Sequence, residues 1–258
     1  KMLKQSLQAL IRNINVMALR RDMPNKISLY LHETEKKELQ DLEKIIIYFQ
    51  SIGYEFVTIN RFSKEISSEV KHVAITFDDG FSNWIRTLDL FKKYNVKATY
   101  FVNTIQFSDL DLEKFLSDIR CDNSNLLINK NELIEIYNNG HEIGAHTHTH
   151  KTLSKLNLIE LTEEIESNLF ILQDLGFDIH NFAIPYGMRR LIKNEHVPYL
   201  LKKFNSIAYG EAGMLHSQSQ KKIQRYPWKV NKSFTYNLNN IKTDTSFFNK
   251  ITKRSGLG

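Results

Sequence analysis

Short apolar runs alternate along this chain with longer segments in which apolar residues recur every three or four positions. The first pattern is typical of buried strands, and the second is typical of the amphipathic helices that cover them. The clearest helical face is formed by Leu158, Leu161, Ile165, Leu169 and Leu172. This alternation predicts an α/β protein whose parallel strands form a barrel-like sheet.

The predicted elements follow one another from about residue 27 to residue 230. Strands are expected at 27–31, 55–59, 72–77, 97–102, 142–145, 182–184, 206–209 and 223–230. Helices are expected near 39–49, 84–94, 112–119, 131–138, 158–172 and 195–204, with a polar connection at 61–71. The tail after Asn231 is rich in Asn, Lys, Ser and Thr, and its pattern predicts no element.

A further amphipathic helix is predicted over residues 3–20, where basic and apolar residues are interspersed. We expect residues 1–24 to be an accessory segment that packs on the barrel. The alternatives are that this segment contacts a second subunit or a membrane surface. Residues 25–258 are expected to form one domain, because a chain of this length can bury a sizeable core without disulfides.

The net charge of +6 and the pI near 9.1 would suit an anionic partner. The excess Lys residues are scattered, however, and no motif of interleaved aromatic and basic residues accompanies them. We therefore interpret the charge as a solvated surface and expect no nucleic-acid partner.

Cys121 is the only cysteine, so the fold contains no internal disulfide. No stretch approaches the roughly 20 consecutive apolar residues of a membrane span. The N-terminal pattern is helical and differs from the continuous apolar core of a signal peptide. These observations predict a cytoplasmic protein, with an exported protein whose signal peptide has been removed as the alternative.

Four of the nine histidines fall between His141 and His150. A helical turn would set His146 and His150 on one face, whereas an extended strand would align His146, His148 and His150. Either geometry predicts a site for a divalent metal, which usually needs a further protein ligand such as a carboxylate. The alternative is a polar loop whose histidines only form hydrogen bonds.

Asp78 and Asp79 follow the apolar run His72-Val73-Ala74-Ile75-Thr76-Phe77 directly. Side chains of adjacent residues leave the backbone in different directions, so one carboxylate can bind a metal while the other acts as a base. The alternative is that one of them caps a helix beginning near Phe81. The chemical interpretation predicts that this acidic turn meets the histidines at the carboxyl end of the sheet.

Together, Thr76-Phe77-Asp78-Asp79-Gly80 and His146-Thr147-His148-Thr149-His150 resemble two motifs of the polysaccharide deacetylase family, the carbohydrate esterases with a NodB homology domain. Phe182-Ala183-Ile184-Pro185-Tyr186-Gly187 resembles the third motif of that family. The resemblance implies a distorted (β/α) barrel, which would make residues 25–258 the catalytic domain.

The resemblance also assigns roles to individual residues. It implies that Asp79, His146 and His150 bind a divalent metal, most commonly zinc, with nickel or cobalt as substitutes. Asp78 would be the catalytic base. Tyr186 would use its backbone N–H to stabilise an oxyanion, and His148 would point away from the metal.

Two features depart from the pattern of the family. Its third motif usually begins with an Arg that orients the catalytic base, and this chain has Ala183 there, with Arg189 and Arg190 as candidates to replace it. Its late Leu-x-His motif, which supplies a general acid, is matched only superficially by Leu215-His216.

His32 is a better candidate for the general acid. The run Leu29-Tyr30-Leu31-His32 resembles the leading part of circularly permuted relatives similar to the poly-N-acetylglucosamine deacetylases. In those relatives a His just after this strand lies in the active site. The alternative is a surface His at the end of a strand.

The resemblance implies a metal-dependent hydrolase that removes an N-acetyl or related N-acyl group from an amino sugar. The substrate would be an N-acetylated sugar, an oligosaccharide, a finished polysaccharide or a lipid-linked precursor. The rival hypothesis is a weakly active or inactive carbohydrate-binding relative that keeps the barrel and the metal. Ala183 and the missing late Leu-x-His motif are the features that favour it.

Overall fold

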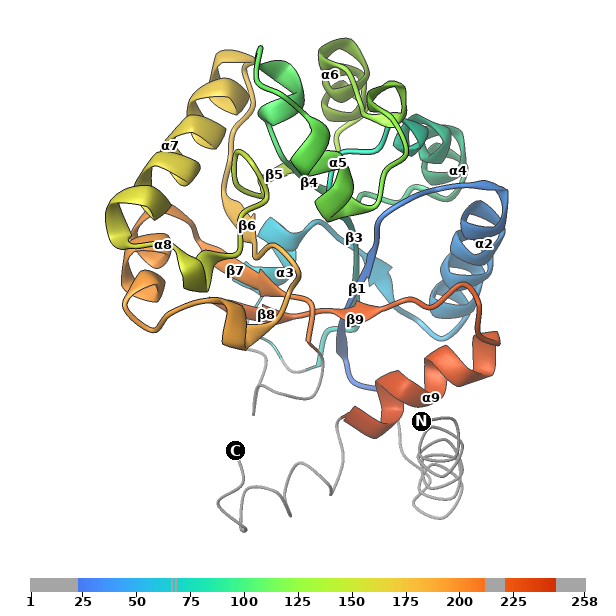
Figure 1. Cartoon of the computed structure of the whole chain (residues 1–258). Helices are drawn as coiled ribbons and strands as arrows, with labels where there is room; N and C mark the ends of the chain where they lie inside the picture. Colours follow the sequence, from blue (N-terminus) through green and yellow to red (C-terminus); the bar gives the residue numbers. More distant parts are fainter. Residues whose placement is uncertain (1–22, 66, 68, 212–220, 245–258) are drawn as a thin grey trace, which may run out of the picture.

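Parallel strands form a sheet that is nearly closed into a barrel and surrounded by helices, as the sequence predicts (Figure 1). The computed structural model describes residues 23–65, 67, 69–211 and 221–244. The helix predicted at 3–20 and the Leu215-His216 pair lie outside these residues. The proposed division into residues 1–24 and 25–258 therefore stays a prediction.

The described strands are β1 (Lys26–Leu31), β2 (Glu55–Phe56), β3 (His72–Phe77), β4 (Thr99–Val102), β5 (Glu142–Ala145), β6 (Asn181–Ala183), β7 (Ser206–Tyr209), β8 (Lys222–Gln224) and β9 (Tyr226–Pro227). The described α-helices are α2 (Lys36–Ser51), α3 (Ile59–Lys64), α4 (Thr87–Tyr94), α5 (Glu113–Ile119), α6 (Lys130–Asn138), α7 (Leu158–Asp174), α8 (His196–Lys203) and α9 (Phe234–Asp244). Short 3₁₀-helices span Ser82–Arg86, Ile105–Phe107, Ser124–Leu126, Leu153–Lys155 and Arg189–Leu191.

The two ends of the sheet are joined by one segment near the C-terminus. The strand order is β8-β7-β6-β5-β4-β3-β1-β9, with β2 beside the start of β3. β8 pairs with β7 and β9 pairs with β1, and only Arg225 separates β8 from β9. The chain from 222 to 227 therefore bridges the last gap in the barrel and places Arg225 at the bridge.

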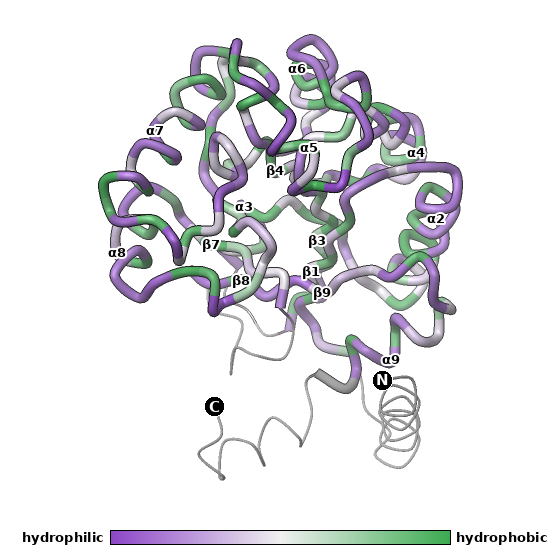
Figure 2. Tube along the Cα trace, in the orientation of Figure 1, coloured by the Kyte–Doolittle hydropathy of each residue, from purple (hydrophilic) through white to green (hydrophobic). Residues whose placement is uncertain are grey.

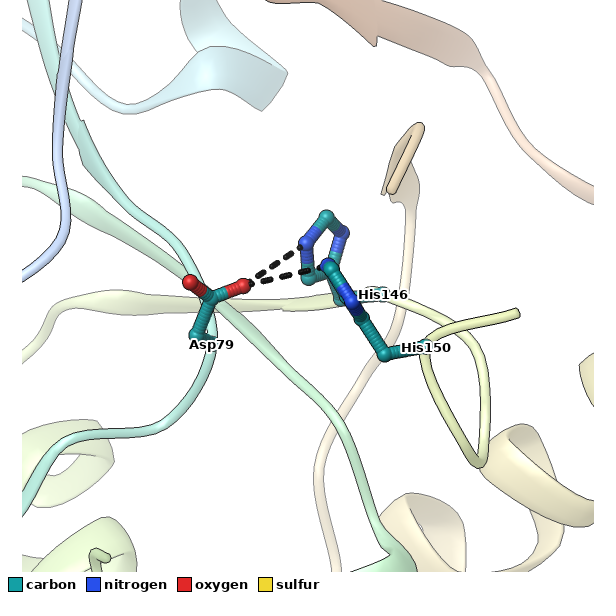
Figure 3. A group of neighbouring side chains, drawn as sticks. All are labelled: Asp79, His146 and His150. Carbon is teal, nitrogen blue, oxygen red and sulfur yellow. Dashed lines mark ion pairs between the residues drawn. The ribbon is translucent and has the colours of Figure 1, made fainter. Parts of the chain in front are cut away.

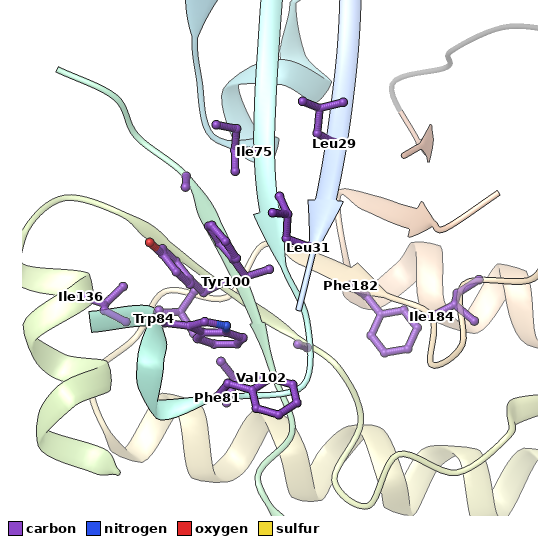
Figure 4. Packing of buried hydrophobic residues seen from close by; sticks show 14 of the residues in the cluster. Leu29, Leu31, Ile75, Phe81, Trp84, Tyr100, Val102, Ile136, Phe182 and Ile184 are labelled. Atoms are coloured by element: carbon purple, nitrogen blue, oxygen red, sulfur yellow. The ribbon is translucent and has the colours of Figure 1, made fainter. Parts of the chain in front are cut away.

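Alternate residues of the strands serve two separate cores. On β3, Val73, Ile75 and Phe77 belong to the large cluster that includes residues of the surrounding helices, and Figure 4 shows part of it. Ala74 instead belongs to a small second cluster with Phe101. In Figure 2 the tube of β3 is mostly green, whereas the helices alternate between green and purple.

The small cluster fills the interior of the barrel. Its strand residues are mostly small, and they are Ala74, Phe101, Ala183, Ala208 and Ile223. Val57 and two residues of α3, Ile59 and Phe62, complete it. The backbone oxygen of Phe62 accepts a hydrogen bond from Lys26 at the start of β1. Helix α3 therefore covers the amino end of the barrel and leaves the carboxyl end for a site.

Several predicted boundaries were wrong. The strand predicted at 55–59 is limited to β2, and α3 occupies the start of the segment predicted as a polar connection. The strand predicted at 223–230 is the pair β8 and β9. The tail forms α9, in which Phe234 packs its ring 5.5 Å from that of Tyr48 on α2.

Among the described residues, no helix combines the length and the apolar composition that crossing a bilayer requires.

Candidate active site

A cavity of about 420 Å³ opens at the carboxyl ends of the strands. Its lining includes both aspartates of the acidic turn, both outer histidines of the histidine stretch, and His32, Tyr186 and Arg225. The segments after β1, β3, β5 and β6 and the junction of β8 and β9 therefore meet here. A cavity of this size is typical of a small-ligand site.

Asp78 and Asp79 face different partners because the backbone turns between them. Asp78 continues the alternation of Ala74 and Thr76, so its side chain lies on the interior side of the barrel wall. Asp79 has a φ of +84°, a strained conformation for an aspartate. Both side chains are buried, and the cap of the following 3₁₀-helix is Phe81. The interpretation of the aspartates as helix caps was wrong.

Arg225 binds the carboxylate of Asp78 with both ends of its guanidinium group. The Nη1–Oδ1 and Nη2–Oδ2 distances are 2.6 and 2.8 Å, and Nη1 also donates to the Thr76 hydroxyl at 3.0 Å. The guanidinium carbon lies 5.1 Å from the ring centre of Tyr30 and 5.2 Å from that of Phe101. Arg225 is fully buried and is held by three hydrogen bonds and two rings, and its two bonds to Asp78 fix the plane of that carboxylate.

Arg225 is the functional residue that the sequence did not identify. Of the two candidates considered, Arg189 donates its backbone N–H to Glu211, and Arg190 contacts the sulfur of Met188. Ala183 lies in the interior cluster beside Phe101, which is in turn adjacent to Arg225. A small residue at 183 is therefore compatible with an Arg that reaches Asp78 from the last strand segment.

His146 to His150, called here the histidine loop, is neither a helix nor a strand. Both geometries considered from the sequence were wrong. β5 ends at Ala145, and Thr147 and His150 adopt positive φ angles of 67° and 59°. These two reversals direct both imidazoles toward Asp79 (Figure 3).

Asp79, His146 and His150 form a group that could hold a metal ion. Oδ1 of Asp79 lies 3.3 Å from Nε2 of His146 and 3.4 Å from Nε2 of His150. Donor atoms about 2.0–2.1 Å from a tetrahedral zinc ion would lie about 3.3–3.4 Å apart, which matches these separations. Nδ1 of His146 lies 2.9 Å from the Ala183 oxygen, so a proton there leaves Nε2 free to bind a metal.

The ionisation of the three residues also suits a cation. Burial alone would raise the pKa of Asp79, but the hydrogen bond with His146 and the charges of His32 and His150 outweigh it and lower that pKa to about 2. Burial lowers the pKa of His150 to about 4, which keeps its imidazole neutral at pH 7. For His146, burial opposes protonation, yet the Asp79 carboxylate raises its pKa. A divalent cation can take the place of that proton.

The other predicted residues lie around this group. His32 is half exposed and lines the cavity, and its Nε2 lies 3.8 Å from Oδ2 of Asp79. The ring of Tyr186 packs 4.6 Å from that of His150, and its φ is +61°. Nδ1 of His148 lies 2.9 Å from the Thr104 hydroxyl, outside the group of three.

Backbone strain is concentrated at this site. Of the non-glycine residues with positive φ in the described ranges, only Asn95 lies away from the cavity and the histidine loop. The others are Asp79, Arg120, Thr147, His150 and Tyr186. Such strain persists where surrounding contacts hold it, and it gathers at functional sites.

Comparisons with known proteins agree with this geometry. A family model described as polysaccharide deacetylase matches residues 65–205, more than half of the chain. The peptidoglycan-N-acetylglucosamine deacetylase of Bacillus cereus is 34% identical over 118 residues, which cover 45% of this chain and 36% of that protein. A chitin deacetylase of Arthroderma benhamiae is 32% identical over 95 residues, which cover 36% of this chain and 21% of that protein. The chain thus spans well under half the length of these relatives.

A solved structure has a similar fold over most of this chain. The Streptococcus pyogenes deacetylase PplD, in complex with acetate, superposes with a TM-score of 0.62 over 86% of this chain and 99% of that one. The two sequences are 17% identical, so this likeness concerns the fold.

Proposed function

The chain belongs to the polysaccharide deacetylase family, and from that premise we propose that it is a metal-dependent hydrolase that removes an N-acetyl group, or a related N-acyl group, from an amino sugar. One observation carries the proposal. Asp78, held rigidly by Arg225, adjoins the buried group of Asp79, His146 and His150. A fixed carboxylate beside a candidate metal site is an arrangement that can hydrolyse an amide, because the metal activates water and the carboxylate accepts its proton.

Asp79, His146 and His150 would hold the ion, for which zinc fits best and nickel or cobalt are substitutes. When bound, such an ion supplies Lewis acidity that activates water and polarises an acyl carbonyl. Asp78 then accepts the proton of the attacking water. Each carboxylate oxygen has a lone pair beyond the one used by Arg225.

His32 and Tyr186 would serve the later stages. His32 is positioned at the mouth of the cavity, where its imidazole can donate a proton to the departing amine. Trp84 donates its indole N–H to the backbone oxygen of His32 and so anchors that position. The backbone N–H of Tyr186 would stabilise the oxyanion, a role that does not depend on the phenol.

The names of the relatives guide the choice of substrate. The two relatives are named for chitin and for the N-acetylglucosamine of peptidoglycan. We infer that this chain acts on an N-acetylated sugar within an oligosaccharide, with a lipid-linked precursor as the alternative. The cavity of about 420 Å³ is large enough to receive one sugar unit.

A panel of acetamido sugars, chitin oligosaccharides, peptidoglycan fragments and O-acetylated sugars tests this proposal. The protein is stripped of metal, reloaded with zinc and incubated with each compound, and mass spectrometry records the loss of acetyl groups. We expect loss from N-acetylated substrates only, and none with Asp79→Asn. Cleavage of O-acetyl esters alone would contradict the amide assignment. Sugar binding without any acetyl loss would favour the inactive relative.

A further inference from the structure

Three buried polar side chains form hydrogen bonds with the histidine loop, do not line the cavity and take no part in the proposed chemistry. Glu164 and Asn168 come from α7, and Asn103 follows β4. Their exposed fractions are 5% for Glu164 and 0% for both asparagines. Burying polar groups is costly unless they are paired, so their partners indicate why they are there.

The two asparagines bind the carbonyl groups at the start of the loop. Nδ2 of Asn103 donates to the backbone oxygens of His146 and Thr147. Nδ2 of Asn168 donates to the Thr147 oxygen at 2.8 Å and to the Val102 oxygen at 3.0 Å. Within the described residues the amide oxygens of both asparagines have no partner, so each side chain acts here only as a donor.

Glu164 binds the middle of the loop. Its carboxylate accepts hydrogen bonds from the backbone N–H of Thr149 at 2.8 Å and from the Thr149 hydroxyl at 2.6 Å. Lys151 balances its charge at 3.0 Å. The backbone oxygen of Glu164 accepts from the N–H of His148 at 3.1 Å. These bonds replace those that a helix or a strand would supply between its own backbone groups.

We propose that Glu164, Asn103 and Asn168 are positioning residues that set the metal affinity of the site by holding His146 and His150 in place. The loop needs such support because Thr147 and His150 both adopt the left-handed conformation that non-glycine residues avoid. Without these contacts the loop relaxes to other conformations. Part of the free energy of metal binding is then used to restore the bound geometry, so the measured affinity for the metal falls. The inference rests on the proposed function only in taking Asp79, His146 and His150 as the ligands of a divalent ion.

Glu164→Gln tests the proposal, with Glu163→Gln as the matched control. Glutamine keeps the size of glutamate, but it loses the negative charge that strengthens both bonds to Thr149 and pairs with Lys151, and only one of its two head atoms can accept a hydrogen bond. Glu163 precedes it on α7 and is exposed. Dissociation constants for Zn²⁺ and Co²⁺ are measured by competition with a chromophoric chelator. We expect Glu164→Gln to weaken binding about 10–100-fold and Glu163→Gln to leave it within about twofold.

Two further measurements separate positioning from general stability. Hydrogen exchange of the Thr149 amide in the metal-free protein should quicken in Glu164→Gln, while the Tm of the metal-free protein stays close to that of the wild type. A purely structural role predicts the reverse, with a lower Tm and an unchanged dissociation constant. If Glu164→Gln fails to fold, Thr149→Val removes one of the same hydrogen bonds and should weaken metal binding in the same direction, by a smaller factor.

The outcomes keep this inference apart from the proposed function. Glu164→Gln that binds zinc as tightly as the wild type overturns the inference, whatever the enzyme does. A wild type that binds zinc but deacetylates no sugar overturns the proposed function, and the comparison of dissociation constants still decides the role of Glu164. A wild type that binds no divalent metal overturns both.

Discussion

The floor and the rim of the cavity differ in how firmly their side chains are held. The floor consists of Asp78, Asp79, His146, His150 and Arg225, and no more than 5% of any of these residues is exposed. The rim consists of His32, Tyr186 and Met188. The exposed fraction is 51% for the His32 side chain, 40% for Tyr186 and 37% for Met188. The barrel thus fixes the groups that would hold a metal and accept a proton, and it leaves in solvent those that would meet the sugar.

The largest expected effect comes from removing a metal ligand from the floor. His146→Ala leaves two of the three protein ligands, so zinc content should fall from about one equivalent to nearly none and acetyl release should fall to background. His148→Ala is the control, because His148 lies two residues away and outside the group of ligands. Metal analysis of purified protein checks both variants. Equal zinc loss in the two would contradict the assignment of ligands.

Next in size is the effect of loosening the floor without removing a ligand. Arg225→Lys keeps the charge but cannot bind both oxygens of Asp78, so kcat should fall about 100-fold while zinc content stays unchanged. Arg225→Leu leaves a buried carboxylate unpaired and should lower the free energy of unfolding by about 3–5 kcal/mol. Steady-state kinetics and urea unfolding measure the two effects. The exposed Arg190→Lys should change neither quantity.

A rim residue should matter only for substrates that need it. His32→Gln removes the proton donor and should lower kcat for an acetamido sugar about 10–100-fold. The same variant should lose less than about threefold on an aryl acetate, because a phenolate leaves without a proton. Comparing the two substrates checks the role. An equal loss on both would show that His32 supports the floor instead of acting on the leaving group.

The smallest expected effect concerns a histidine far from both regions. His141 precedes β5 and is buried against the rings of Phe91 and Tyr100, and its Nδ1 accepts a hydrogen bond from the Ala98 N–H. Burial, with help from the Lys97 charge, lowers its pKa to about 4.

The pKa of His141 in the folded protein lies below its value of about 6.5 in the unfolded chain. At a pH between these two values, the unfolded chain therefore binds the proton more readily than the folded protein does. The contribution of His141 to the free energy of unfolding is therefore fully present above about pH 6.5 and is lost as the pH falls toward 4. The loss is about 2 kcal/mol at pH 5. Urea unfolding at pH 7.5 and pH 5 measures the loss. The loss of stability should be smaller in His141→Gln than in the wild type. An equal loss in the two proteins would show that His141 is not its source.

The floor was only partly predictable from the sequence. The aspartates and the histidines each form a contiguous stretch after an apolar run, so their types and their place at strand ends could be inferred. The contact of Arg225 with Asp78 spans 147 positions along the chain. It depends on the closure of the barrel by β8 and β9, which no local pattern indicates.

The shape of the histidine loop was unpredictable for another reason. Positive φ angles are expected at glycine, yet here they occur at Asp79, Thr147 and His150. Contacts with residues elsewhere in the sequence, such as Asn103 and Glu164, stabilise that conformation. The apolar periodicity of the loop itself does not reveal these contacts. Most of the strand and helix order was predictable, because it depends on the apolar periodicity of each segment, whereas α3 and α9 lie in polar segments that were predicted to contain no element.

The central claim is that two residues adjacent in sequence have different roles, with Asp78 as the base and Asp79 as a metal ligand. Its most direct test is the rate of acetate release by Asp78→Asn, with zinc content measured on the same sample. We predict a full equivalent of zinc and a kcat about 10²–10⁴-fold below that of the wild type. Wild-type turnover by Asp78→Asn, or the loss of its zinc, would contradict the division.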